Sequence, residues 1–347
     1  HEPQTPYELP ATPHSPDITV LSTGRTLKEA LKAGRWKVPA AIFVASAIVF
    51  LLFAWERGLK QSPDTHFVYL ANTYNTMIAA NFSDEAAKRR EGKVAFELDK
   101  RPHHRNDWAS YWEFETKSGE NFRGIWMDKT GKGRFLKLDG TAVVLDQNTL
   151  RGAERTQRYF VSFPPAPAFV MMPLAAIWGY DVNDVLFTIF FAALNVMLMF
   201  LLLRRLSEGG RTGRGQKENL WLTALFGFGT AHLWCSVLGQ VWFTALIVGI
   251  TFTLLYLYFA IDTKHPFLAG VAMALAFSTR TPLVFGAVFF YVFLLFPGGK
   301  LRTGDWKGAL KKGALFSLPC LVVGISSLAM NYIRFESLSE FGHKYLA

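Results

Sequence analysis

The stretch VLFTIFFAALNVMLMFLLL occupies residues 185–203 and contains no charged side chain. A helix needs about 20 predominantly apolar residues to cross the hydrocarbon core of a bilayer, so this run by itself predicts a membrane span. Further apolar runs occupy residues 38–55, 220–238, 241–260, 266–279, 282–297 and 314–331. The sequence therefore predicts an α-helical polytopic membrane protein with about seven transmembrane helices.

The composition agrees with this fold class. Of the 347 residues, 50% are hydrophobic and 15% aromatic, and the net charge is +10. The basic residues cluster in short loops between the apolar runs, where they set topology, so nucleic acid is not expected as a partner. Cys235 and Cys320 both lie inside apolar runs, where thiols behave as small hydrophobes, and they predict neither a disulfide framework nor a metal site.

The distribution of basic residues predicts the orientation, because cytoplasmic loops carry an excess of Lys and Arg. Residues 1–37 are therefore expected to be a cytoplasmic tail, 56–163 and 332–347 to be extracytoplasmic, and 181–331 to hold the six later spans. The basic loops all fall on the cytoplasmic side only if the Pro-rich run 164–180 does not cross the membrane. We interpret that run as a re-entrant or interfacial helix. The orienting residues are Arg25, Lys28, Lys32, Arg35, Lys37, Arg204, Arg205, Arg211, Arg214 and Lys217.

The loop after the first span has two predicted parts. Ser62-Pro63 resembles an N-cap followed by Pro at the first helical position, and apolar residues then recur every three to four positions, which predicts an interfacial helix over 63–80. Residues 83–107 are charged and loop-like. A period of two follows, with Asp139-Gly140 as a hairpin signal, which predicts a small β-rich insert over 93–160.

Two charged residues are the main candidates for chemistry. Asp64 follows the first span, where a carboxylate could take a proton from an acceptor hydroxyl, although an acid there also stabilises a helix start. Arg280 lies between two apolar runs, where a charge faces either a cavity or the membrane surface. His103-His104 carries metal-capable side chains, but adjacent residues seldom converge on one ion, so we expect a solvated loop and no metal site.

Weaker candidates lie near the same predicted face of the membrane. Gln240 and His232 stand where aromatic anchors are expected in any case. Arg334 and His343, in the polar and aromatic segment after the last run, could line the same cavity or simply begin a loop.

Three short motifs, taken in order, resemble the GT-C superfamily of membrane glycosyltransferases, near the bacterial protein mannosyltransferases and the lipid A aminoarabinose transferase. They are Pro63-Asp64-Thr65-His66-Phe67-Val68-Tyr69-Leu70-Ala71, Tyr159-Phe160-Val161-Ser162-Phe163-Pro164-Pro165 and Ala276-Phe277-Ser278-Thr279-Arg280-Thr281-Pro282. Each motif is short, and their order gives the resemblance its weight. Many relatives carry a second acid beside the first, whereas Pro63 and Thr65 flank Asp64. Relatives also continue into further spans, so we expect this chain to be part of a longer protein.

The resemblance implies a bacterial inner-membrane enzyme that transfers a sugar from a polyprenyl-phosphate donor to an acceptor hydroxyl. Asp64 would be the catalytic base, Arg280 and Arg334 would bind the donor phosphate, and His66, Gln240 and His343 would contact substrate. Membrane lipid and lipid-linked sugar are the implied partners, and a divalent metal is left open. The alternative is a non-catalytic subunit with a GT-C-like scaffold whose insert docks a partner protein. A transporter is less favoured, because no internal repeat is evident.

Overall fold

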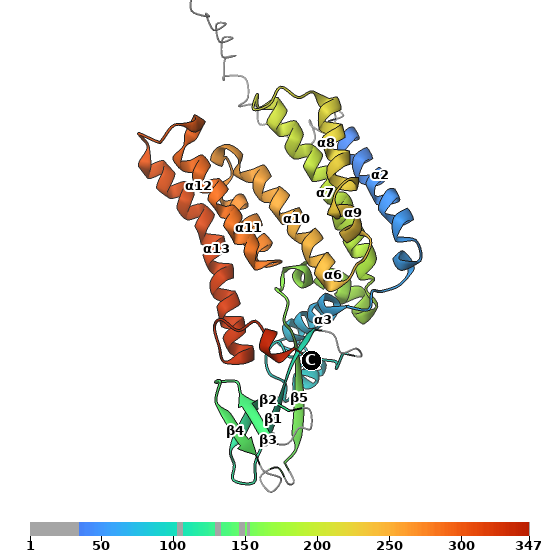
Figure 1. Ribbon diagram of the computed structural model, residues 1–347, viewed down its shortest axis with the longest axis vertical. Helices are drawn as coiled ribbons and strands as arrows, with labels where there is room; N and C mark the ends of the chain where they lie inside the picture. Colours follow the sequence, from blue (N-terminus) through green and yellow to red (C-terminus); the bar gives the residue numbers. More distant parts are fainter. Residues whose placement is uncertain (1–34, 103–106, 129–132, 146–149, 151–152, 347) are drawn as a thin grey trace, which may run out of the picture.

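The computed structural model describes residues 35–346 except 103–106, 129–132, 146–149 and 151–152. The predicted cytoplasmic tail, apart from its last residues, and the His103-His104 pair therefore lie outside the described residues. The molecule is elongated, with a helical bundle at one end and a small β-sheet at the other (Figure 1).

Among the described residues, four helices are long and apolar enough to cross a membrane: α2 (Lys37–Ala54), α7 (Asp184–Glu208), α10 (Val241–Ala260) and α13 (Trp306–Phe335). The predicted count of seven is not confirmed, because three of the apolar runs form shorter pieces. These are α8 (Gln216–Phe228), α9 (Ala231–Ser236), α11 (Pro266–Phe277), the 3-10 turn η5 (Thr281–Ala287) and α12 (Val288–Leu295). The remaining 3-10 turns are η2 (Trp55–Leu59), η3 (Gly179–Asp181), η4 (Ile261–Thr263), η6 (Pro297–Gly299) and η7 (His343–Tyr345).

The run 220–238 is divided by a cap within it. The helix α8 ends at Phe228, and the Thr230 hydroxyl then accepts a hydrogen bond from the His232 backbone N–H at 3.2 Å, which starts α9. Thr favours this capping position because its side-chain oxygen satisfies a free N–H of the first turn. Gly227, near the end of α8, allows close packing on α7, because an added Cβ would lie 2.9 Å from the Val196 side chain.

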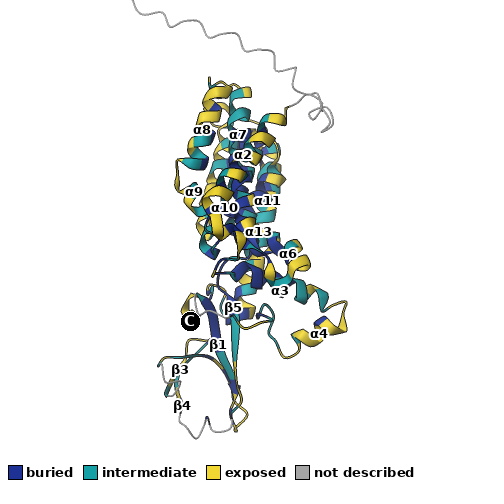
Figure 2. Ribbon diagram, turned by 90° about the vertical axis from the view of Figure 1, so that its right-hand side faces the viewer, coloured by how far each residue is buried: buried dark blue, intermediate teal, exposed yellow. Residues whose placement is uncertain are grey.

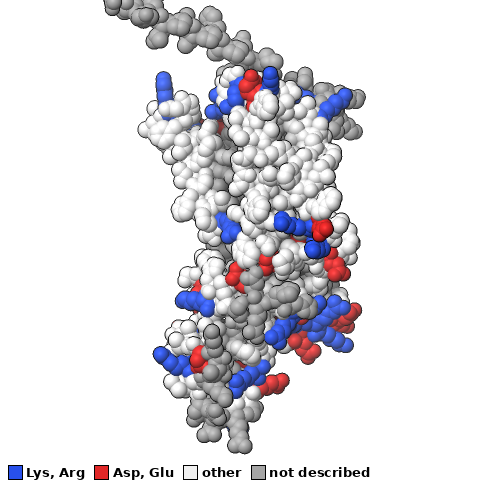
Figure 3. All heavy atoms as spheres, turned by 45° about the vertical axis from the view of Figure 1, so that its right-hand side comes forward, with Lys and Arg blue, Asp and Glu red and all other residues white. Residues whose placement is uncertain are grey.

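The helices form one layered bundle. In Figure 1, α2, α7 and α8 lie on one side, α10 in the middle, and α11, α12 and α13 on the other side. Of the four candidate spans, α7 and α10 are the most buried and α13 is the most exposed. Charged side chains gather at the ends of the bundle and over the sheet, with a largely uncharged band between them (Figure 3).

The predicted β-rich insert is a five-stranded antiparallel sheet with the strand order β4-β3-β2-β1-β5. The predicted hairpin joins β3 and β4, and Gly140 adopts the positive φ of 89° that its turn needs. The strands are β1 (Trp108–Glu115), β2 (Asn121–Trp126), β3 (Gly133–Lys137), β4 (Ala142–Leu145) and β5 (Arg155–Val161).

The junction between bundle and sheet contains α3 (His66–Ala79), α4 (Asp84–Arg90) and α6 (Ala166–Trp178). The start predicted for α3 at Ser62-Pro63 is wrong, because the helix begins at His66. The Ser62 hydroxyl and N–H donate to the Asp184 carboxylate, which fixes this segment before the helix. The interfacial position of this helix stays a prediction. Asn72 and Asn75 donate to the carbonyls of Gly179 and Met172, so this side of α3 packs on η3 and α6.

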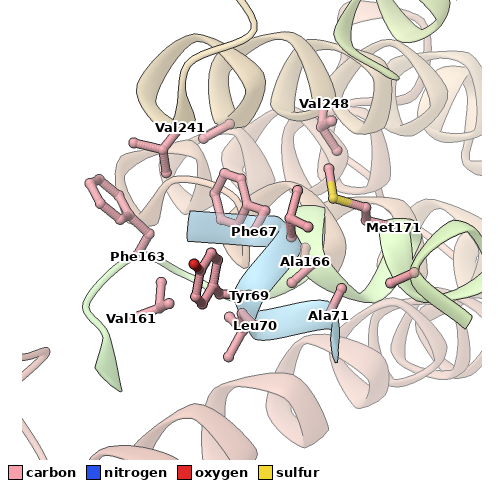
Figure 4. Close-up of a cluster of buried hydrophobic side chains, with 14 of the residues drawn as sticks. Phe67, Tyr69, Leu70, Ala71, Val161, Phe163, Ala166, Met171, Val241 and Val248 are labelled. Atoms are coloured by element: carbon pink, nitrogen blue, oxygen red, sulfur yellow. The ribbon is translucent and has the colours of Figure 1, made fainter. Parts of the chain in front are cut away.

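Helix α3 therefore lies inside the junction. Its apolar side chains Phe67 and Leu70 belong to a core that continues into α6 and α10 (Figure 4). Buried residues extend from this core through the bundle (Figure 2). The short α6 ends after 13 residues at Trp178 and is not among the candidate spans in the described chain, as its Pro residues predict.

Candidate functional site

The three motif segments meet around the linker Val161–Ala166, which leads from β5 to α6. The Ala166 N–H donates to the Ser278 carbonyl at 2.9 Å, so the linker is joined to the segment between α11 and η5. A pocket at this point is lined by residues of the linker, of that segment and of the end of α13. They are Ser162, Phe163, Pro164, Pro165, Phe277, Ser278, Thr281, Ser327, Met330, Asn331, Arg334 and Phe341. Segments that are more than 100 residues apart in sequence thus form one site.

Asp64 and His66 lie on the sheet side of this linker. Asp64 is 5% exposed, and its backbone N–H donates to the Ser62 hydroxyl at 3.3 Å. The buried His66 ring stacks on Trp108, with 3.8 Å between ring centroids, and meets the Phe163 ring edge-on at 5.4 Å. The first and second motifs are therefore in contact through His66 and Phe163.

Arg280 lies on the bundle side of the same linker. Its Nη2 donates to the Trp242 carbonyl at 3.1 Å, and the Trp242 ring meets Phe163 edge-on at 6.3 Å. Its Nε is buried without a hydrogen-bond partner, and none of the ion pairs among the described residues involves this arginine. An unpaired buried donor is costly, so an anionic oxygen at this position would be strongly stabilised.

Arg334 is bound to the protein itself. It is 3% exposed and donates to the carbonyls of Val161 at 2.7 Å and Met330 at 3.2 Å, and to the Asn331 side chain at 2.8 Å. It thereby joins the end of α13 to the end of β5. The phosphate-binding role remains a prediction, but these contacts give the guanidinium a structural role.

The two other predicted substrate contacts are less central. Gln240 is partly exposed and precedes α10, where its carbonyl accepts the N–H groups of Phe243 and Thr244. His343 is exposed in η7, beside Tyr345, which stacks on Phe335. The structure thus places His343 against the sheet and not in the lining of the linker pocket.

His232 belongs to a buried polar cluster between α7, α9 and α10. Its Nδ1 lies 3.3 Å from both the Gly227 carbonyl and the Ser236 hydroxyl, and its Nε2 lies 3.4 Å from the Asn195 amide. Thr251 donates to the other end of the Asn195 side chain. A neutral ring that donates from Nδ1 and accepts at Nε2 satisfies this arrangement, so helix packing explains the residue.

Sequence reasoning missed an apolar groove between α6 and α7. Its lining is almost entirely apolar, with a polar end next to η3. The lining residues are Val170, Pro173, Leu174, Trp178, Asp181, Val182, Asn183, Leu186, Phe187, Phe190 and Phe191. The sequence carries no signal for it, because its two walls come from separate runs.

A charged network in the insert was also missed. Arg158 pairs with Glu97 at 2.5 Å and with Glu113, and Arg123 pairs with Glu113 at 2.8 Å. Partial burial raises the pKa of Glu113, but hydrogen bonds from Arg123 and Arg158 outweigh burial, and the net shift is downward. This network holds β1, β2 and β5 together and lies away from the linker pocket.

Within the described residues, no group of three or more His, Cys, Asp or Glu side chains is arranged to hold a metal ion. Comparison of the chain with protein-family models, with curated proteins and with solved structures finds no match.

Proposed function

We propose that this chain is the membrane part of a GT-C-type glycosyltransferase that uses a polyprenyl-phosphate sugar as donor. The observation that carries the proposal is the buried, unpaired Nε of Arg280, which lies across Phe163 from the segment of Asp64 and His66. Arg280 is a cation with a free donor on one side of the linker, and Asp64 is a carboxylate on the other side. This arrangement suits a reaction in which a hydroxyl is deprotonated and a phosphate leaves.

In the proposed reaction, the Asp64 carboxylate takes the proton of the acceptor hydroxyl. The acceptor oxygen forms a bond to the anomeric carbon while the bond from that carbon to the phosphate oxygen breaks, with inversion. Polyprenyl phosphate leaves with the electron pair, and Arg280 stabilises its negative charge. The apolar groove between α6 and α7 offers a surface for the polyprenyl chain.

The proposed setting is a bacterial inner membrane, with the N-terminus in the cytoplasm and the sheet on the outer side. The basic residues Arg204, Arg205, Arg211 and Lys312 lie at the end of the bundle that would then face the cytoplasm. In this setting three further crossings complete the seven that the sequence predicts. Each is a short or broken helix packed against the long ones: α8 with α9, then α11, then η5 with α12.

The direct test is sugar transfer by the membrane-reconstituted chain, with polyprenyl-phosphate sugars as donors and release of polyprenyl phosphate as the readout. Asp64→Asn should abolish release and retain the thermal stability of the wild type. Asp84→Asn, which changes an exposed acid at the start of α4 and outside both the linker pocket and the groove, is the matched control and should retain release. Full activity of Asp64→Asn would refute the mechanism.

A second candidate is a non-catalytic subunit whose insert binds a partner protein. It is favoured by β4, the outermost strand of the described sheet, on which Val144 is 77% exposed. Exposed edge strands are templates for pairing with another chain. If Asp64→Asn and Arg280→Gln both leave function in the cell unchanged while Val144→Lys abolishes it, this candidate replaces the enzyme.

A further inference from the structure

A second pocket lies at the sheet-proximal end of α2, away from the linker. It is formed by the turn η2 and by α9, and its lining combines two indole rings, one acid and one base with apolar side chains. The lining residues are Phe53, Ala54, Trp55, Glu56, Arg57, Thr230, Leu233, Trp234 and Val237. None of these residues belongs to the site proposed for sugar transfer.

The backbone is strained at Trp55, a residue with a large aromatic side chain at this pocket. Trp55 has φ 49° and ψ −125°, a conformation that a bulky residue rarely adopts, and the residue is 72% exposed. Such strain persists only where the surrounding structure enforces it and is common at ligand sites. Trp234, on α9, is 61% exposed on the other side of the pocket.

The turn is held rigidly from behind. The Gly58 carbonyl accepts a hydrogen bond from the Asn183 side chain at 3.0 Å, and the Gln61 side chain donates to the carbonyls of Tyr180 and Val182. These contacts attach the turn to the start of α7. The side chains of Glu56 and Arg57 are therefore presented from a fixed backbone, which reduces the entropy lost when a ligand binds.

The charges of the pocket are available to a ligand. Glu56 and Arg57 are exposed, and neither takes part in an ion pair with another described residue. A guanidinium suits a phosphate, a carboxylate suits an ammonium group, and Trp faces also attract cations. An anionic headgroup would meet the Glu56 carboxylate unfavourably, whereas a zwitterionic one satisfies both charges.

We propose that this pocket binds the headgroup of a zwitterionic aminophospholipid. Arg57 binds the phosphate, Glu56 binds the ammonium group between the rings of Trp55 and Trp234, and the acyl chains lie against Phe53 and other apolar side chains at the end of α2. In membrane proteins, tryptophan is enriched at the depth of the lipid headgroups.

The test is lipid binding to the detergent-solubilised chain, measured by native mass spectrometry with phosphatidylethanolamine and phosphatidylglycerol of identical acyl chains. The wild type should favour phosphatidylethanolamine by about threefold or more, as expected for partly exposed charge contacts. Glu56→Gln should remove this preference, and Arg57→Gln should weaken binding of both lipids. Lys60→Gln changes an exposed charge in the same loop outside the lining and should behave as the wild type.

Equal binding of the two lipids by the wild type, or a preference that survives Glu56→Gln, would overturn the proposal. Soluble phosphoethanolamine at millimolar concentration should leave the lipid bound, because it lacks the acyl chains. Displacement by this compound would assign the pocket to a soluble zwitterion and overturn the lipid assignment.

Discussion

Replacement of Arg334 by Met should detach the end of α13 from the sheet. Arg334 is 3% exposed and donates to three protein acceptors, of which the Val161 carbonyl and the Asn331 side chain are the closest. Hydrogen bonds from a charged donor contribute about 1.5–3 kcal/mol each, and a buried acceptor left unpaired costs about 1–3 kcal/mol. These terms overlap, and removal of the buried cation also removes its desolvation cost, so we expect a net loss of about 1–3 kcal/mol.

The assay is thermal unfolding of the purified variant in detergent, combined with hydrogen exchange of the linker 161–166. Arg334→Met should lower the unfolding midpoint and increase exchange at the linker. Lys307→Met, which changes an exposed cation in the first turn of the same helix, should do neither. If Arg334→Met has wild-type stability and loses only sugar transfer, the arginine binds substrate and the structural interpretation is refuted.

Three further changes probe the insert and the bundle. The pKa of Glu113 lies below its ordinary value of 4.5, so its ion pairs stabilise the sheet above pH 4.5, and this contribution is lost as the pH falls through the lowered pKa. The unfolding midpoint should therefore decrease less between pH 6 and pH 3 in Glu113→Gln than in the wild type. Gly124→Ala would place a Cβ 2.0 Å from a carbonyl oxygen of β3 and should cost about 1–3 kcal/mol or more, whereas Gly213→Ala, with open space around it, should be silent in the same unfolding assay. Asp184→Ala should destabilise the bundle by about 1–3 kcal/mol, because it leaves the buried N–H and hydroxyl of Ser62 without their acceptor. Unchanged unfolding of this variant would contradict the role of the pair.

Local patterns predicted the apolar runs, the β-rich insert and its Asp139-Gly140 hairpin. These features depend on residues close in sequence, whose periodicity or turn chemistry is visible without a fold. The same patterns predict about seven spans, of which four are single long helices in the described chain and three consist of shorter pieces. The cap at Thr230 lies inside a continuous apolar run, and hydrophobicity alone does not show that a helix stops and restarts there.

Contacts between distant segments could not be predicted. Ser62-Pro63 predicts a helix start, but the Ser62 hydroxyl and N–H both donate to Asp184, which is 122 residues away, and the helix begins only at His66. Arg334 was selected for its charge and predicted side, yet its closest carbonyl acceptor, Val161, is 173 residues away. A local signal singled out each residue, the cap pattern for Ser62 and the charge for Arg334, but only the fold assigns the partners.

The most direct measurement for the proposed site is a structure of the chain in a lipid nanodisc with polyprenyl phosphate bound. We expect density for the phosphate within hydrogen-bond distance of Arg280 Nε, near the linker 161–166, and density for the polyprenyl chain in the groove between α6 and α7. Phosphate bound elsewhere, with Arg280 Nε paired to a protein acceptor, would contradict this expectation.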